Sequence, residues 1–150
     1  MVNLSRWTMG DPQRPMPQSY DYSSNMRGTM GVKHVSEVPS QAVANARHTS
    51  IQVLISAQEA PHFLMRRFVM QPGGGMPRHT NTVEHEQYVL RGRARIGIGE
   101  ETYEVKPGDV VFIPAGTPHW YENIGEEPFE FLCLIPNKPD EVRLLDSSSC

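Results

Sequence analysis

Short runs of alternating apolar and polar residues follow one another from about residue 50 to residue 136. The runs are SIQVLISA, HFLMRRFVMQ, HEQYVLRG, RARIGIG, ETYEVK, DVVFIPA, HWYEN and FEFLCLIP. Clusters of Gly, Pro and acidic residues separate them, among them PGGGMP, KPGD and PAGTP, and such clusters are typical of turns and loops. The pattern predicts an all-β protein, built as a barrel or a sandwich.

The N-terminal third has a different texture. Residues 1–31 are rich in Pro, Met, Ser, Gly and Asn and poor in aliphatic side chains, which predicts an N-terminal arm or a disordered leader. GVKHV then predicts a short strand-like piece, and the residues after it a short helix with Ser36 as its cap and Pro39 in its first turn. The predicted division is therefore an arm at 1–31, a barrel at 32–137 and a C-terminal tail at 138–150.

The overall composition narrows the classes of function. A chain of 150 residues is the size of one domain, and its net charge of -3 offers no general attraction to nucleic acid or to anionic membranes. Its apolar runs are far shorter than the roughly 20 residues that span a bilayer. The two cysteines, Cys133 and Cys150, do not make a disulfide framework. We expect a cytoplasmic protein with no nucleic-acid or membrane partner.

Histidines stand at particular positions in two of the predicted strands. Because side chains alternate between the faces of a strand, His85, Gln87 and Val89 share one face, and His119 and Tyr121 share a face of another strand. With His79 in the loop before the first strand, these imidazoles can converge inside a barrel, where neutral imidazoles bind divalent metals. Spacing alone leaves open that the three histidines are structural or merely solvated.

Two segments resemble the paired motifs of the cupin superfamily. Gly73 to Gly92 is similar to the first motif, with its glycine, its histidine, two further ligand positions and a closing glycine. GDVVFIPAGTPHWYEN is similar to the second motif, with the anchors Gly108, Pro114, Gly116, His119 and Asn123. The resemblance covers about Ile51 to Pro136 and implies a single-domain jelly-roll barrel with a metal near its centre.

Within that superfamily the chain resembles small one-barrel cupins that hold their metal with four histidines and end in FLCLIP. The resemblance implies four ligands, at His79, Asn81, His85 and His119. It also implies one divalent transition metal ion, manganese or iron first, with zinc or nickel as alternatives. Asn81 departs from the pattern, because those relatives have histidine there. An amide oxygen is a weaker and harder donor than imidazole, so Asn81 binds weakly, binds through water, or does not bind.

Four further residues are candidates for the pocket around the metal. The resemblance places Cys133 near the ion, as a ligand, as a group behind a ligand or as a redox-sensitive thiol, whereas a plain interpretation is a small buried hydrophobe. Gln87 and Tyr121 each follow a candidate ligand on the same strand face. Arg66 and Arg67 are adjacent on one strand, so one of them faces inward and suits a substrate carboxylate or phosphate, and we name Arg66 as the candidate.

The resulting hypothesis is a metal-dependent cupin enzyme that acts on a small polar molecule, by oxygen-dependent oxidation or carbon-carbon cleavage of the dioxygenase type. One alternative is redox-neutral chemistry, in which the ion is the Lewis acid of an isomerase, a lyase or a sugar-phosphate enzyme. Another is a barrel without catalysis that binds a small molecule. Barrels of this kind are commonly paired, so we expect a homodimer.

Overall fold

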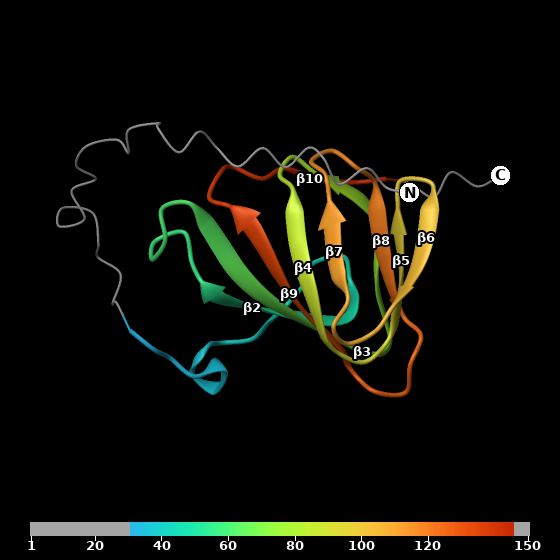
Figure 1. Cartoon of the computed structure of the whole chain (residues 1–150), viewed down its shortest axis with the longest axis horizontal. Coiled ribbons are helices and arrows are strands. Elements are labelled where there is room, and N and C mark those ends of the chain that lie inside the picture. The colour runs from blue at the N-terminus through green and yellow to red at the C-terminus, as the bar shows by residue number, and fades with distance from the viewer. Residues whose placement is uncertain (1–30, 146–150) are drawn as a thin grey trace, which may run out of the picture.

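The computed structural model of the protein describes residues 31–145, which form one curled antiparallel sheet (Figure 1). The strands are β1 (Gln41–Ala42), β2 (Arg47–Ile55), β3 (Phe63–Asn81), β4 (His85–Arg91), β5 (Ala94–Ile98), β6 (Glu101–Val105), β7 (Val110–Ile113), β8 (His119–Asn123), β9 (Phe129–Pro136) and β10 (Val142–Leu144). Their order across the sheet is β6-β5-β8-β3-β9-β4-β7, with β2 and β10 also paired to β3 and with β1 paired to β2. The all-β prediction is confirmed. Within residues 31–145 there is no helix that is long and apolar enough to cross a membrane.

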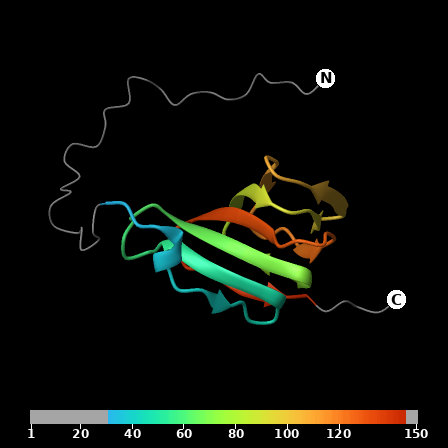
Figure 2. The ribbon, with the colours of Figure 1, turned by 90° about the horizontal axis from the view of Figure 1, so that it is seen from below.

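Strand β3 connects the two layers of the curled sheet. Its first part, Phe63 to Met70, pairs with β9, and its last part pairs with β8 through Gly75, Met76 and His79. Figure 2 shows β3 (green) running beside β2 (teal), with the strands from yellow to brown in a separate group. The chain therefore changes partner in the middle of one strand, and this bend curls the sheet around its interior.

Glycines make the bend in β3 possible, at a place where the sequence predicts a loop. Gly73 has φ +78°, a left-handed conformation that side chains other than glycine rarely adopt. A Cβ at Gly74 would lie 2.7 Å from the carbonyl oxygen of Gln71 and 2.9 Å from that of Arg47. The prediction of a loop at PGGGMP is wrong, because Gly75 pairs with both β2 and β8 and the strand continues to Asn81.

The N-terminal predictions need correction where the structure describes them. A single 3-10 turn, η1 (Val35–Glu37), stands where a helix was predicted, and His34 rather than Ser36 caps it. The ring Nδ1 of His34 accepts from the backbone N–H of Ser36 at 3.2 Å. No helix follows, because β1 pairs with β2 and uses its backbone groups there. GVKHV forms no strand, and residues 1–30 of the predicted arm lie outside the described residues.

The C-terminal segment belongs to the sheet. Strand β10 pairs with the end of β3, with Val142 opposite Asn81 and Leu144 opposite His79. The sequence predicts a tail at 138–150, because a run of only three alternating residues is too short to indicate a strand. The pairing brings β10 alongside the candidate ligands of β3.

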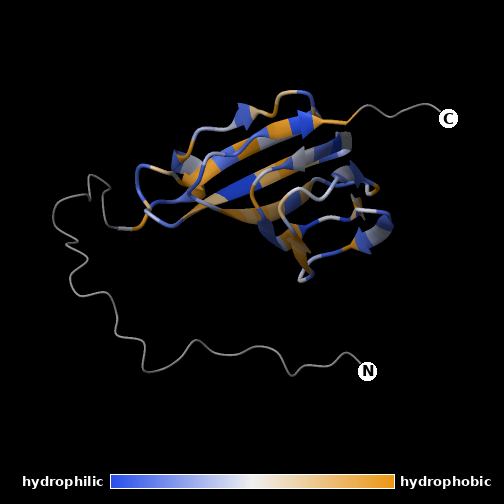
Figure 3. Ribbon diagram, turned by 90° about the horizontal axis from the view of Figure 1, so that it is seen from above, coloured by the Kyte–Doolittle hydropathy of each residue, from blue (hydrophilic) through white to orange (hydrophobic). Residues whose placement is uncertain are grey.

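The core follows the alternation that the sequence predicts. On β4 the side chains of His85, Gln87 and Val89 are buried, and on β8 those of His119 and Tyr121 are buried. Bands of apolar and polar residues alternate along the strands in Figure 3. The buried rings of Phe68, Phe131 and Tyr121 stack in sequence, with centroid distances of 5.0 Å and 5.3 Å. The predicted strand faces are confirmed.

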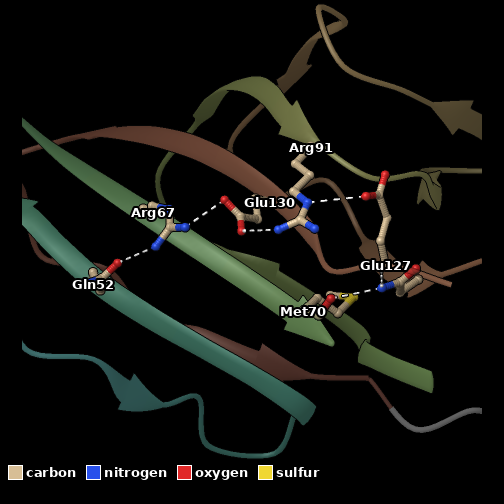
Figure 4. A network of polar contacts seen from close by, with 7 residues as sticks. Gln52, Arg67, Met70, Arg91, Glu127 and Glu130 are labelled. Carbon is tan, nitrogen blue, oxygen red and sulfur yellow. Dashed lines mark hydrogen bonds and ion pairs between the residues drawn. The ribbon is translucent and has the colours of Figure 1, made fainter. Parts of the chain in front are cut away.

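Polar side chains on the outside of β3 and β9 form a surface network (Figure 4). Arg67 donates to the Glu130 carboxylate at 2.7 Å and to the Gln52 amide oxygen at 2.7 Å. Arg91 contacts both Glu130 and Glu127, at 3.9 Å and 3.3 Å. Arg67 therefore lies outside the barrel, and its neighbour Arg66 takes the opposite face.

Candidate metal centre

A pocket of about 520 Å³ lies inside the curled sheet. Its polar lining includes all eight predicted site residues, Arg66, His79, Asn81, His85, Gln87, His119, Tyr121 and Cys133, together with Asn45. The rest of its lining is mainly apolar and includes Ala42, Val43, Ala46, Ile51, Phe68, Met76, Phe131, Val142 and Leu144. The predicted site residues thus share one cavity, and the rest of its lining is mainly apolar.

His79 and His119 face each other across paired strands, with ring centroids 4.2 Å apart. Each ring has its Nδ1 beside a backbone carbonyl, that of Pro77 at 2.7 Å for His79 and that of Thr117 at 2.8 Å for His119. Because a carbonyl only accepts hydrogen bonds, both Nδ1 atoms carry the proton, and each Nε2 keeps its lone pair. The Nε2 of His119 is buried and has no hydrogen-bond partner. These rings have the tautomer that a metal ligand needs.

His79 also differs from its predicted setting. The sequence predicts that His79 lies in a loop before β4. In the structure His79 lies within β3 and pairs with both β8 and β10. A strand with neighbours on two sides holds the ring more rigidly than a loop would. This rigidity suits a group that must present one lone pair in a defined direction.

Asn81 ends β3 and is buried, with 6% of its surface exposed. Its amide Nδ2 donates to Asp140 Oδ2 at 2.7 Å, and its Oδ1 is buried without a hydrogen-bond partner. A buried amide oxygen without a partner costs free energy unless something else binds it. The oxygen is therefore a candidate donor atom toward the pocket.

His85 has a different environment from the other two rings. Its Nδ1 lies 3.3 Å from Cys133 Sγ and 3.4 Å from Arg66 Nη2, and its Nε2 is buried without a hydrogen-bond partner. Arg66 Nη2 also donates to Cys133 Sγ at 3.0 Å. Cys133 and Arg66 thus contact the Nδ1 edge of His85, while its Nε2 is left without a partner.

The electrostatics of the pocket keep the imidazoles neutral. Burial, together with the charge of Arg66, lowers the pKa of His85 to about 3. Burial lowers the pKa of His119 to about 4 and also lowers the pKa of His79. All three rings are therefore unprotonated at neutral pH, which is the form that coordinates metals.

The types of donor atom suit a divalent ion, but their side chains are not yet close enough to form a closed ligand cluster. Asn81 Oδ1, His85 Nε2 and His119 Nε2 are all buried and unpartnered, as expected for donor atoms that an ion would satisfy. The ring centroids of His85 and His119 are 5.3 Å apart. Within residues 31–145 no three His, Cys, Asp or Glu side chains already stand as a closed ligand cluster. Binding of an ion would draw these side chains together.

Gln87 and Tyr121 form a buried pair beside the histidines. Gln87 Nε2 donates to the Tyr121 hydroxyl at 2.6 Å and lies 3.8 Å from Cys133 Sγ. Burial raises the pKa of the Tyr121 hydroxyl and also that of the Cys133 thiol. Both groups carry their protons at neutral pH and can donate hydrogen bonds.

Sequence reasoning missed two parts of this site. Asp140, which binds Asn81, lies in the segment assigned to a tail, where neither alternation nor a motif marks it. The apolar wall from residues 42–46 and β10 was also missed, because its residues are short, scattered and distant in sequence from the motifs.

Comparison with known proteins agrees with this architecture. The family model described as Cupin domain matches residues 66–135. The solved structure of the polyketide cyclase RemF from Streptomyces resistomycificus superposes with a TM-score of 0.70 and 30% sequence identity, over 79% of this chain and 88% of that one. The protein belongs to the cupin superfamily. This cupin has both motifs in place, with the second within β7, β8 and the turn between them.

Two curated relatives of this cupin match over shorter regions. The uncharacterized protein MJ1618 of Methanocaldococcus jannaschii is 46% identical over 67 residues, which is 43% of this chain and 54% of the relative. The oxalate decarboxylase OxdC of Bacillus subtilis is 35% identical over 69 residues, 42% of this chain and 18% of the relative. The match therefore spans about half of one curated relative and under a fifth of the other.

Proposed function

We propose that this cupin is a metal-dependent enzyme whose ion is held by His79, Asn81, His85 and His119. The observation that carries the proposal is the set of buried donor atoms without partners, on three different strands, that line one pocket. When bound, a divalent ion would polarise a substrate carbonyl or enediol or, as iron or manganese, bring substrate and dioxygen together. Three neutral imidazoles and a neutral amide leave the ion its full charge and open positions.

The substrate that the pocket favours has an oxygen-bearing end and an apolar body. Arg66 lies at the polar end, and its Nε is buried without a hydrogen-bond partner. A guanidinium with a free donor suits a carboxylate, an enolate or another oxygen group. The apolar lining, which includes Ile51, Met76 and Leu144, offers no hydrogen-bond partners to a sugar or another molecule that is polar all round. The prediction of a small polar substrate therefore changes to a substrate with a polar end and an apolar body.

The chain's own residues would orient this substrate. Tyr121 and Cys133 keep their protons at neutral pH, so they can donate hydrogen bonds to a substrate oxygen but serve poorly as bases. Gln87 fixes the hydroxyl oxygen of Tyr121. The proposed oxygen-dependent oxidation or carbon-carbon cleavage rests on the open positions of the ion, where a substrate oxygen and dioxygen could bind together. The similarity to a polyketide cyclase and an oxalate decarboxylase supports an enzyme.

The first experiment measures metal content. Protein purified without a His tag is analysed for its elements and titrated with Mn²⁺, Fe²⁺ and Zn²⁺ by calorimetry. We expect close to one ion per chain. Less than about a tenth of an equivalent, with no uptake on titration, would leave a binding barrel without catalysis as the better function.

The second experiment separates oxidative from redox-neutral chemistry. Metal-loaded protein is screened with aromatic and aliphatic keto acids, diketones and enols, in air and under argon, while oxygen consumption is recorded. We expect turnover that consumes dioxygen and stops under argon. Turnover that continues unchanged under argon would assign the ion the role of a Lewis acid.

A further inference from the structure

The amide of Asn81 has a fixed orientation. Its two ends differ in chemistry, because the NH₂ group only donates hydrogen bonds and the oxygen only accepts them. The carboxylate of Asp140, which only accepts, lies 2.7 Å from the NH₂ end. The oxygen must therefore point away from Asp140, and it is the buried atom without a partner.

Asp140 is itself held from two directions. Its Oδ1 accepts from the backbone N–H of Thr82 at 3.1 Å and from the Thr82 hydroxyl at 3.4 Å. The Thr82 hydroxyl in turn accepts from the backbone N–H of Glu141 at 2.9 Å. Pairing of Val142 with Asn81 adds a backbone constraint two residues further along. The carboxylate is thus positioned by the chain on both sides of it, without any contribution from the Asn81 side chain.

We propose that Asp140 is a positioning residue that turns the Asn81 oxygen toward the three imidazoles, so that the metal centre has three nitrogen donors and one neutral oxygen donor. The inference rests on the proposed metal site and deepens it. A hydrogen-bonded carboxylate behind a ligand fixes its direction and raises its basicity. A carbonyl-type oxygen favours harder ions such as Mn²⁺ over Zn²⁺ more than a fourth imidazole would. Asp140 therefore increases both the affinity for Mn²⁺ and the preference for it.

A purely structural role for Asp140 makes a different prediction. In that case its contacts with Thr82 and Asn81 only close the end of β3 against β10. Its removal would lower the stability of the metal-free protein and weaken all metals alike. A role through Asn81 instead changes the ratio of Mn²⁺ to Zn²⁺ affinity, and that change disappears once Asn81 is gone.

The test is a double-mutant cycle on the full chain, with Mn²⁺ and Zn²⁺ affinities measured by calorimetry. Asp140→Ala is expected to weaken Mn²⁺ binding by about 10- to 100-fold, and Zn²⁺ binding by less. In an Asn81→Ala background the same substitution should cause little further loss of Mn²⁺ affinity. Asp109→Ala is the matched control, because Asp109 also accepts from a backbone N–H in a turn, that of Lys106, but lies outside the pocket lining.

Thermal melting of the metal-free variants accompanies the cycle. If Asp140→Ala does not fold, Asp140→Asn takes its place. The new amide oxygen can still accept from Asn81, while the negative charge is lost. Asp140→Asn should weaken Mn²⁺ binding several-fold less than Asn81→Ala does. Equal losses for Mn²⁺ and Zn²⁺, or additive losses in the cycle, would overturn the role of Asp140. Wild-type protein that binds neither ion would instead remove the proposed function itself.

Discussion

The two sides of the pocket hold their polar groups in different ways. On the side of β3 and β8, His79, Asn81 and His119 each have an acceptor behind them, two backbone carbonyls and the Asp140 carboxylate. On the side of β4 and β9, the Nδ1 of His85 contacts the thiol of Cys133 and the guanidinium of Arg66. The first side determines which atom points into the pocket, whereas the second leaves the proton of His85 undetermined.

This difference gives the two sides separate effects, one on the orientation of the metal ligands and one on the electrostatics of the pocket. Fixed acceptors orient a ligand before the ion arrives, which reduces the entropy that binding must offset. A cation and a soft thiol next to His85 instead change the charge that the pocket presents. The first side therefore pre-orients its donor atoms for the ion, and the second adjusts the electrostatics around His85.

The largest effect should come from removing one of the buried imidazole rings. His119→Ala deletes a buried donor atom whose tautomer is already set, so we expect the protein to lose its metal on gel filtration, as should His85→Ala. Asn81→Ala should only weaken retention, because an amide oxygen is the weaker donor. Elemental analysis of each purified variant checks this order. Equal loss in all three would make Asn81 a full ligand, and no loss in any would remove the site.

A second prediction uses two neighbouring arginines on opposite faces of β3. Arg66→Leu should raise the pKa of His85, because the guanidinium is among the causes that lower it. Arg67→Leu should leave the pKa of His85 unchanged but lower the free energy of unfolding by about 1 to 2 kcal/mol, since it removes hydrogen bonds to Glu130 and Gln52. NMR titration of the ring and urea denaturation measure the two effects. A similar shift in both variants would contradict the opposite placement of the two side chains.

A third prediction concerns pH and the metal-free protein. The unfolded chain protonates its histidines near pH 6.5, whereas the folded protein keeps His119 and His85 neutral down to pKa values of about 4 and about 3. Below about pH 6.5 the unfolded state therefore binds more protons, and stability falls as the pH falls toward 4. Thermal melting across this range should show the decline, and a His85→Gln His119→Gln variant should show a shallower one. Parallel curves for the two proteins would refute it.

The smallest effect should come from Cys133→Ser. A hydroxyl can contact Nδ1 of His85 much as the thiol does, and Cys133 lies on that edge of the ring rather than at Nε2. We expect Mn²⁺ affinity to change less than in Asp140→Ala. Calorimetry measures it. A loss as large as that of His119→Ala would make Cys133 a ligand and would remove the distinction between the two sides of the pocket.

Local periodicity was enough to predict which side chains point inward. The alternation in HEQYVL and HWYEN placed His85, Gln87, His119 and Tyr121 on buried faces, because a strand repeats every two residues whatever its partners are. The same rule required that only one of Arg66 and Arg67 face inward. It could not say which, because that depends on which face of β3 the curled sheet encloses.

Pairing between distant strands determined the structure of two segments for which local sequence patterns gave wrong predictions. PGGGMP has the composition of a turn, yet its Gly75 pairs with β2 on one side and with β8 on the other, so the strand continues through it. The short helix predicted after Ser36 does not form, because β1 pairs with β2 there. In both cases the backbone groups found partners far along the chain, and no local propensity reports such partners.

The sequence by itself determined the family, the all-β class and seven of the eight predicted side chains that share the pocket, because motif spacing and strand alternation are local properties. Only the tertiary structure decided that Arg66 faces the pocket, that an apolar wall closes it, and that Asn81 presents its oxygen. That last point depends on Asp140, which lies 59 positions away and reaches Asn81 only because β10 pairs with β3. The direction of an amide is set by its hydrogen-bond partner, and that partner is found only in the folded chain.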